Sequence, residues 1–328
     1  MKRILGIGNA LVDIMTLIEG DYILQEFNLP KGSMQLVDLE TSRGIKSATA
    51  IFPRTYTSGG SAANTIHGLA MLGADTGFIG SIGRDDTGDF FENDMKKAGV
   101  NTLLIRRDSV TGTAVALITR DTERTFATHL GAAVELSAED FSPMLIGDYD
   151  ILYLEGYLIT DFKVIEAACR FARENNMLIA LDLSSYNVVE GFLDQFKEII
   201  EKYVDILFAN EQEARAFTGL DPEKALTQLS ELSEIVILKV GAEGSWVKCN
   251  DEVIKVSAIP VNCVDTTGAG DLYAAGFLYG FGMDLNLENC GKLGSLMAGR
   301  VIEIVGARMD REKFRKIKKE IEEIIAAG

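Results

Sequence analysis

The stretch Asp265-Thr-Thr-Gly-Ala-Gly-Asp271, followed by the apolar run 272–283, is the most informative part of this chain. Its small residues, Gly268, Ala269 and Gly270, stand where a loop opens a helix. Backbone N–H groups at such a position lack intrahelical partners, and the helix dipole adds to their positive potential. A turn of this kind binds anions, phosphate in particular. We therefore predict an anion hole at residues 268–270.

Asp271 is a carboxylate in the first turn of the same predicted helix. A carboxylate would repel phosphate, but it suits a general base that takes a proton from an attacking hydroxyl group. Its reference pKa of roughly 4 keeps it charged at neutral pH. From the spacing alone, a plain N-cap is an equally good interpretation of this residue.

Three further polar segments lie at the ends of predicted elements. Gly59 and Gly60 precede a helix that contains Asn64; paired glycines admit a ligand close to the backbone, and the amide can hydrogen-bond a polyol. Asn210 and Glu213 follow a predicted strand, at the sheet edge where ligands bind in open α/β folds, and they suit water-mediated Mg²⁺. Taken alone, helix capping explains that pair better. The third segment, a candidate turn under a nucleotide, is Lys239-Val-Gly241-Ala-Glu-Gly244.

Short apolar runs alternate with amphipathic segments along most of the chain. The runs are rich in Ile, Leu, Val and Phe, as is typical of strands covered on both faces. The predicted strands are 4–8, 76–80, 151–154, 178–183, 206–209 and 235–240, and the predicted helices include 86–97, 164–174, 191–202 and 310–327. This alternation predicts an α/β fold with a parallel sheet and right-handed crossovers.

Two segments break the alternation. Residues 11–57 contain no clean βα unit, and residues 103–130 alternate about a polar turn at 120–124, which predicts a hairpin. We interpret them as one small β lid, formed by residues 11–57 and 103–130, on an α/β body formed by residues 1–10, 58–102 and 131–328. The alternative is a pair of ordinary surface excursions. The exposed lid face is also a candidate surface for a homodimer, because pairing would cover its edge strands.

The composition and motif content of the chain argue against several classes of partner and site. The 328 residues carry 49 acidic and 32 basic side chains, a formal charge of −17, which disfavours partners such as nucleic acids and anionic membranes. Two histidines and no H-E-x-x-H leave no multi-histidine metal site. The chain lacks both a G-x-G-x-x-G fingerprint and a P-loop motif. Because no targeting or spanning segment is evident, we expect a cytoplasmic protein.

Four motifs in consistent order resemble the ribokinase-like, or PfkB-type, carbohydrate and nucleoside kinases. They are Asp265–Asp271, the two parts of Gly59–Gly88 (G-G-S-A-A-N and I-G-x-D-x-x-G) and Asn210-x-x-Glu213. The likeness runs from residue 6 to residue 307. It implies a three-layer α/β/α body with a mostly parallel sheet, a small inserted β lid, and phosphate transfer from ATP, with Mg²⁺, to a hydroxymethyl group.

The resemblance also implies a role for each motif residue. Asp271 would be the catalytic base, beside an anion hole formed by Gly268, Ala269 and Gly270. The acceptor would be bound by Asp13, Gly59, Gly60 and Asn64, and Arg124 on the lid would reach substrate or phosphate. The residues expected to border the nucleotide are Asn210, Lys239, Gly241, Gly244 and Thr266, with Glu213 holding Mg²⁺ through water.

Within the family, adenosine kinases are the nearest likeness, on Gly8-Asn9 with Asp13, the run 123–125 and the run 130–133. We therefore expect a nucleoside such as adenosine as the acceptor. Two departures leave other acceptors open: Lys239 replaces the usual Thr, and Ser-Ala-Ala-Asn at 61–64 is shared with sugar kinases. The alternatives are a kinase of a free sugar or sugar acid (ribose, fructose or 2-keto-3-deoxygluconate type), a kinase of a vitamin-like alcohol, and a non-catalytic sensor. Aromatic candidates for stacking on a base are Phe126, Tyr157 and Phe162.

Overall fold

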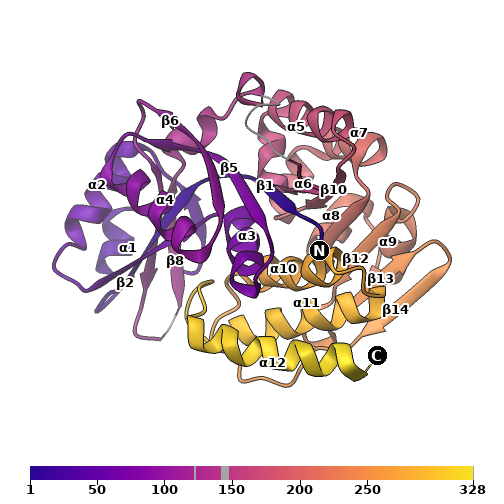
Figure 1. The fold of residues 1–328 in the computed structure, drawn as a ribbon. Helices are drawn as coiled ribbons and strands as arrows, with labels where there is room; N and C mark the ends of the chain where they lie inside the picture. The colour runs from indigo at the N-terminus through magenta and orange to yellow at the C-terminus, as the bar shows by residue number, and fades with distance from the viewer. Residues whose placement is uncertain (122, 142–147, 328) are drawn as a thin grey trace.

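A nine-stranded sheet forms the centre of the computed structural model, which describes residues 1–121, 123–141 and 148–327 (Figure 1). Its strand order is β14-β13-β12-β11-β10-β9-β1-β5-β6. The strands from β12 to β6 in this order run parallel, and β13 runs antiparallel to both of its neighbours, β12 and β14. The bounds are β1 (Ile4–Ile7), β5 (Thr76–Gly83), β6 (Asn101–Arg107), β9 (Ile151–Glu155), β10 (Leu178–Asp182), β11 (Ile206–Asn210), β12 (Ile235–Lys239), β13 (Ser245–Cys249) and β14 (Glu252–Val256).

Helices cover both faces of this sheet and enclose two apolar cores. One core contains Phe277 and Phe314, from α10 and α12, and the other contains Phe171 and Phe196, from α5 and α7. Because the parallel strands are apolar on both faces, each face needs a helical layer. The predicted three-layer α/β/α fold with a mostly parallel sheet is confirmed.

The helices of the body follow the strands closely, as short βα connections require. In order they are α3 (Ser61–Leu72), α4 (Asp86–Ala98), α5 (Phe162–Glu174), α6 (Tyr186–Gly191), α7 (Leu193–Tyr203), α8 (Glu211–Thr218), α9 (Pro222–Leu229), α10 (Ala269–Gly282), α11 (Leu287–Val301) and α12 (Arg311–Ala327). Short 3₁₀ turns are η1 (Gly131–Glu135), η2 (Ala138–Asp140), η3 (Gly156–Thr160) and η4 (Gly241–Glu243).

A second, five-stranded sheet forms the lid, seen to the left of the body in Figure 1. Its order is β3-β8-β7-β2-β4, and β7 and β8 form the predicted hairpin. Its elements are β2 (Leu11–Leu17), α1 (Tyr22–Glu26), β3 (Met34–Leu36), α2 (Leu39–Ala48), β4 (Arg54–Gly59), β7 (Gly112–Ile118) and β8 (Arg124–His129).

The boundary between lid and body differs from the prediction at residue 103. Residues 101–107 form β6, which pairs with β5 in the large sheet. Leu103 and Ile105 pack on one core and Leu104 on the other, so this segment is held between the helical layers. The lid sheet resumes only at Gly112, and at the other boundary β4 extends to Gly59 rather than ending at residue 57.

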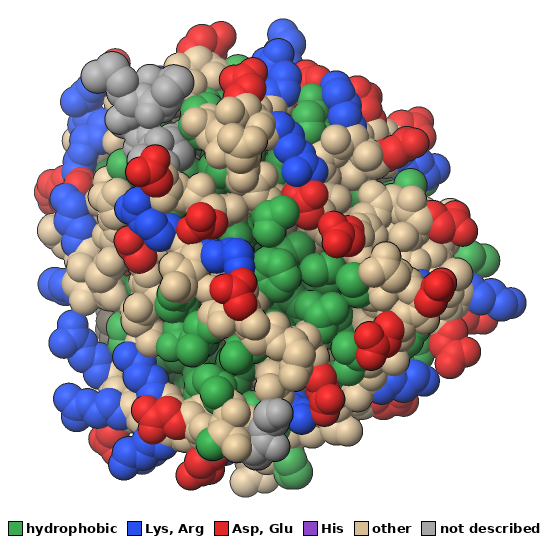
Figure 2. Space-filling model, turned by 45° about the vertical axis from the view of Figure 1, so that its right-hand side comes forward, with side chains coloured by type: hydrophobic (Ala, Val, Ile, Leu, Met, Phe, Trp, Pro, Cys, Tyr) green, Lys and Arg blue, Asp and Glu red, His purple; other side chains and the backbone are tan. Residues whose placement is uncertain are grey.

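The outer surface carries charges of both signs. Figure 2 shows acidic and basic side chains interspersed around a central group of hydrophobic side chains on one face. No helix within the described residues combines the length and apolar character needed to cross a bilayer.

Candidate active site

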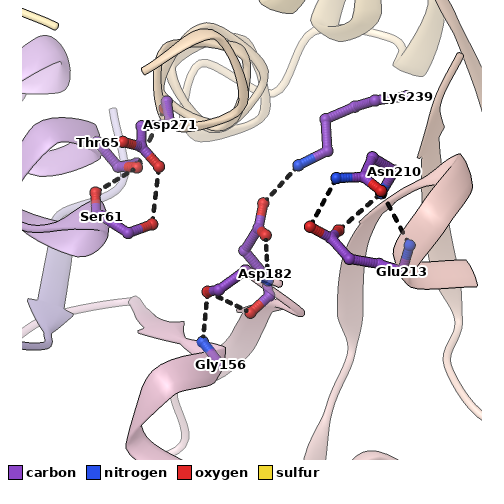
Figure 3. A network of polar contacts seen from close by, with 9 residues as sticks. Ser61, Thr65, Gly156, Asp182, Asn210, Glu213, Lys239 and Asp271 are labelled. Atoms are coloured by element: carbon purple, nitrogen blue, oxygen red, sulfur yellow. Dashed lines mark hydrogen bonds and ion pairs between the residues drawn. The ribbon is translucent and has the colours of Figure 1, made fainter. Parts of the chain in front are cut away.

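Polar side chains end four neighbouring parallel strands of the large sheet. Glu155, Asp182, Asn210 and Lys239 are the last residues of β9, β10, β11 and β12. The carboxyl ends of parallel strands meet at one edge, and ligands bind there in open α/β sheets. The apolar strands therefore bring these side chains together, three of them within the polar network of Figure 3.

Asp271 lies in the first turn of α10 and faces α3. Its carboxylate accepts hydrogen bonds from Ser61 Oγ at 2.7 Å and from Asn64 Nδ2 at 2.9 Å. Burial raises the pKa of Asp271 to about 6, although the two hydrogen bonds act in the opposite direction. The carboxylate thus points across the site toward another element, which a helix N-cap does not do.

The turn before α10 has the geometry of an anion site. Gly268 adopts φ 76°, a left-handed conformation that favours glycine, and its α-carbon packs against Ala307. The N–H of Ala269 donates to the carbonyl of Thr266 at 3.1 Å. Within the described part of the chain, the N–H groups of Gly270 and Asp271 have no hydrogen-bond acceptor. Of the expected donors, the N–H of Gly270 is therefore free and that of Ala269 is already used, while the N–H of Asp271 is a further free donor.

The predicted acceptor residues converge from the lid and the body. Asp13 lies on β2 with its carboxylate directly against Gly59, where any Cβ would collide with it. Gly60 adopts φ 98° at the start of α3, with its α-carbon close to the carbonyl of Asn9. Asn64 is 6% exposed, and its Oδ1 has no hydrogen-bond partner among the described residues. Asn64 thus joins Asp271 to this group of residues and leaves one buried acceptor atom without a donor.

Asp13 is a half-buried carboxylate in an unusual electrostatic position. None of the hydrogen-bond donors in the described ranges reaches it. Burial raises the pKa of Asp13 to about 7, Arg308 lowers it, and the charge of Asp271 raises it further. Sugar hydroxyl groups are donors of the kind that this carboxylate lacks.

Lys239 stands beside the anion hole in an ion pair with Asp182. Its Nζ lies 2.7 Å from Asp182 Oδ2, and a Cβ at Gly270 would lie 3.2 Å from the same Nζ. Asp182 is 4% exposed, so the pair is buried. The predicted nucleotide residue Lys239 thus brings a fixed positive charge to the predicted phosphate position.

Asn210 and Glu213 form a reciprocal cap on α8. Asn210 Oδ1 accepts from the N–H of Glu213 at 2.9 Å, and Glu213 Oε2 accepts from the N–H of Asn210 at 2.8 Å. The capping interpretation of this pair therefore holds. Glu213 is 3% exposed, and burial raises its pKa, with Asp182 adding to the effect.

The donor set is compatible with Mg²⁺ only as a shared ligand. The described residues contain no group of three or more His, Cys, Asp or Glu side chains able to hold a metal. Mg²⁺ typically uses one or two carboxylates together with substrate phosphates and several waters. The neighbouring carboxylates of Asp182 and Glu213 supply such oxygens, so the site fits Mg²⁺ that arrives with phosphate.

The other predicted nucleotide residues have different surroundings. Gly241 has φ 55°, and its α-carbon faces open space apart from a distant Glu211 carboxylate. The α-carbon of Gly244 packs tightly against the carbonyl of Val256, so the strand packing alone requires a glycine there. Thr266 is exposed, and its carbonyl is the acceptor for Ala269.

Arg124 connects the lid to the loop before the anion hole. It forms an ion pair with Asp265 and donates to Thr267 Oγ1 at 3.1 Å. The side chains of the pair are 12% and 8% exposed. In this structure Arg124 therefore binds the loop at Asp265–Thr267 rather than an open phosphate position, and it joins the lid to the body.

One face of the lid sheet is turned toward the body and carries an apolar row. Strand register places Met15, Ala116, Phe126 and Met34 side by side on four strands, one step along the face from Asp13. Met34, on the edge strand β3 next to Phe126, is 51% exposed, which leaves apolar surface open at the far end of this row. Of the aromatic candidates, Phe126 lies on this face.

The other two aromatic candidates lie elsewhere. Phe162 packs against a core. Tyr157 is half-buried on η3; burial raises the pKa of its hydroxyl, and Glu155 and other site carboxylates add to the shift.

Sequence reasoning missed two buried carboxylates, Asp182 and Glu155. Glu155 accepts from the N–H and the side chain of Asn9 at 2.8 and 2.5 Å and from the N–H of Ala62 at 2.9 Å. Burial raises its pKa to about 7. The available signal was a single acid at the end of an otherwise apolar run, which is costly to bury unless it has a role.

Comparison with known proteins agrees with this geometry. The family model "pfkB family carbohydrate kinase" matches residues 34–313. An uncharacterized sugar kinase of Archaeoglobus fulgidus is 31% identical over 244 residues, covering 74% of this chain and 96% of that protein.

Two solved structures share the whole fold. A probable sugar kinase from Rhizobium etli CFN 42 has a TM-score of 0.88 at 34% identity and covers 97% of this chain and 98% of its own. An adenosine kinase from Sinorhizobium meliloti has a TM-score of 0.87 at 35% identity and covers 97% of this chain and 99% of its own. This chain therefore belongs to the pfkB family of carbohydrate kinases and is a phosphotransferase that acts on an alcohol group.

Proposed function

We propose that the protein is an ATP- and Mg²⁺-dependent kinase of a ribose-type acceptor, with a nucleoside such as adenosine as its preferred substrate. The observation that carries the proposal is the position of Asp271. This half-buried carboxylate adjoins two free N–H groups of α10 on one side and the acceptor residues on the other. A group able to accept a proton therefore lies beside a site able to gather phosphate charge.

The acceptor residues would orient the sugar. Asp13 and the free Oδ1 of Asn64 accept hydrogen bonds from ring hydroxyl groups, which leaves the hydroxymethyl oxygen facing Asp271. That oxygen attacks the γ-phosphorus, the bond from this phosphorus to the ADP oxygen breaks, and the hydroxyl proton moves to Asp271. A pKa of about 6 suits this role, because the carboxylate is charged at neutral pH yet more basic than an ordinary one.

The donor residues would neutralise the phosphates. The N–H groups of Gly270 and Asp271 are free among the described residues, and the ammonium of Lys239 lies against Gly270. Gly241 and Thr266 would border the nucleotide. Mg²⁺, when bound, offsets phosphate charge, and Glu213 would hold it through water beside Asn210. Closure of the lid excludes water from the reacting groups.

The lid face supports a nucleoside rather than a free sugar. A free sugar carries hydroxyl groups on every side, but the side chains of the row that contains Met15 and Phe126 offer no hydrogen-bond partner for them. A flat apolar base attached to the sugar would cover this exposed surface and stack on the aromatic ring. The adenosine kinase from Sinorhizobium meliloti, at 35% identity, is in keeping with this choice.

An ADP-release assay with MgATP over adenosine, other nucleosides, ribose, fructose and 2-keto-3-deoxygluconate tests the proposal. We expect kcat/KM to be highest for a nucleoside. Phe126→Ala should lower kcat/KM for that nucleoside roughly 10-fold or more, since base–aromatic stacking contributes about 1–3 kcal/mol. Phe162→Ala is the matched control, because this ring packs on the core.

The alternatives give different results in the same assay. A higher kcat/KM for ribose, fructose or the sugar acid would replace the nucleoside with a free sugar. Binding of these compounds without ADP production would make the protein a sensor and end the catalytic proposal.

A further inference from the structure

Residues 306–308, which follow α11, contact both halves of the site. The N–H of Gly306 donates to Asp265 Oδ2 at 2.6 Å, in the loop that leads to the anion hole. Ala307 packs against Gly268, the first residue of that hole. Arg308 then reaches in the other direction, to Ser58 on the lid strand β4. Three consecutive residues thus connect the loop at 265–268, which leads into the anion hole, to the turn at Ser58–Gly60 beside the acceptor residues.

The guanidinium of Arg308 makes two hydrogen bonds to Ser58, the residue just before Gly59. Its Nε donates to the carbonyl of Ser58 at 2.8 Å, and its Nη2 donates to Ser58 Oγ at 2.9 Å. Ser58 in turn donates to Asp94 on α4, through its N–H at 3.1 Å and its hydroxyl at 2.6 Å. The fork of an arginine makes both contacts at once, which the single ammonium of a lysine cannot reproduce.

The remaining part of the guanidinium is buried without a protein partner. Nη1 has no hydrogen-bond acceptor among the residues that the structure describes. The charged groups that face Arg308 are the carboxylates of Asp94, Asp13 and Asp271. His67 on α3 also lies near it, and burial lowers the pKa of this imidazole well below its ordinary value. Burial lowers the pKa of Arg308 to about 10, so it keeps its charge at neutral pH.

We propose that Arg308 is a positioning residue for the acceptor, which fixes the Ser58–Gly60 turn and favours the charged form of the Asp13 carboxylate. Asp13 lies against Gly59, so movement of this turn displaces the carboxylate that would bind the sugar. The two groups that act on the charge of Asp13 are Arg308, from the segment after α11, and Asp271, from α10. The inference rests on the proposed kinase function.

The test compares Arg308→Met, Arg308→Lys and the control Arg311→Met. Among the described residues, Arg311 donates at the surface to the carbonyl of Lys97 alone, so its loss should change little. Arg308→Met should raise the acceptor KM about 10- to 100-fold, the effect expected when hydrogen bonds from a charged group are lost, with the ATP KM within about twofold. Arg308→Lys should recover part of the loss.

The pH profile separates positioning from a merely structural role. Without the guanidinium, the pKa of Asp13 rises, so the acid limb of kcat/KM for the acceptor moves to higher pH in Arg308→Met. Arg308→Lys and Arg311→Met should keep the limb near its original position. Asp13→Asn serves as the reference, because the limb belongs to Asp13 only if this variant lacks it.

Three results would overturn the inference. An unchanged acceptor KM in Arg308→Met removes the positioning role. Equal losses for ATP and acceptor with no pH shift indicate a structural role. A wild-type protein that phosphorylates none of the acceptors ends the proposed function and this inference with it. If Arg308→Met does not fold, Arg308→Lys and Ser58→Ala decide, and a wild-type acceptor KM in both excludes the proposal.

Discussion

The acceptor and donor halves of the site differ in whether their polar groups already have partners. In the acceptor half, the Asp13 carboxylate and Asn64 Oδ1 have no donor among the described residues. In the donor half, the N–H groups of Gly270 and Asp271 are free within the described ranges, but the side chains are paired, Lys239 with Asp182 and Asn210 with Glu213. The acceptor half is therefore already formed for a polyol, whereas the donor half must exchange internal partners for phosphate and metal when ATP binds.

Asp271 lies between the halves, and its loss should have the largest effect. Asp271→Asn keeps the shape of the side chain but cannot accept the hydroxyl proton. We expect kcat to fall roughly 10²- to 10⁴-fold, with acceptor binding changed much less. Steady-state kinetics and calorimetric titration of the acceptor measure both quantities. A turnover near that of the wild type would remove the assigned role.

Lys239 tests whether the donor half depends on its internal ion pair. Lys239→Met leaves the Asp182 carboxylate buried without its ammonium, which should lower the free energy of unfolding by about 3–5 kcal/mol. Lys239→Met combined with Asp182→Asn should recover much of this stability in a urea titration, but the KM for ATP should stay raised about 10-fold. An unchanged KM for ATP would place the ammonium outside the donor site.

Solution pH should move stability and activity in opposite directions. Burial raises the pKa of Asp13 and Glu155 to about 7 and that of Asp271 to about 6, so the protonated forms favour the folded state. Stability from these groups is complete below their unfolded pKa values and is lost as pH rises through about 7. kcat should instead rise through about pH 6, as Asp271 loses its proton.

Thermal melts and initial rates between pH 5 and 8 check both trends. This window lies above the titration of ordinary carboxylates, so it isolates the buried ones. Asp271→Asn should show a shallower loss of Tm across the window. A Tm that rises steadily with pH would contradict the conclusion that desolvation raises the pKa values of these carboxylates in the folded state.

The body of the fold was predictable because its strands are buried on both faces. Runs such as Leu178–Asp182 are apolar throughout, and their alternation with amphipathic helices allows few topologies. The end of the lid segment was not predictable in the same way. Residues 103–107 have the alternation of a half-exposed ribbon, but they form β6 between two helical layers, and only the packed structure reveals those layers.

The site was predictable where one short segment carries the chemistry. The anion hole and Asp271 lie within one segment of seven residues, 265–271. The paired glycines, Gly59 and Gly60, stand only five and four residues before Asn64 in the sequence. Asp182 and Glu155 were missed because their partners are distant in sequence: Lys239 is 57 residues from one, and Asn9 is 146 residues from the other. Spacing within a motif cannot reveal an interaction of that range.

Glu155 has a further consequence for how the protein is made. It ends β9 and receives three hydrogen bonds from residues that flank β1 and begin α3. β1 itself lies between β5 and β9, so the first strand completes its pairing only after residue 155 leaves the ribosome. Asn9, encoded near the start of the chain, therefore waits for nearly half of synthesis before its hydrogen bonds to Glu155 can form.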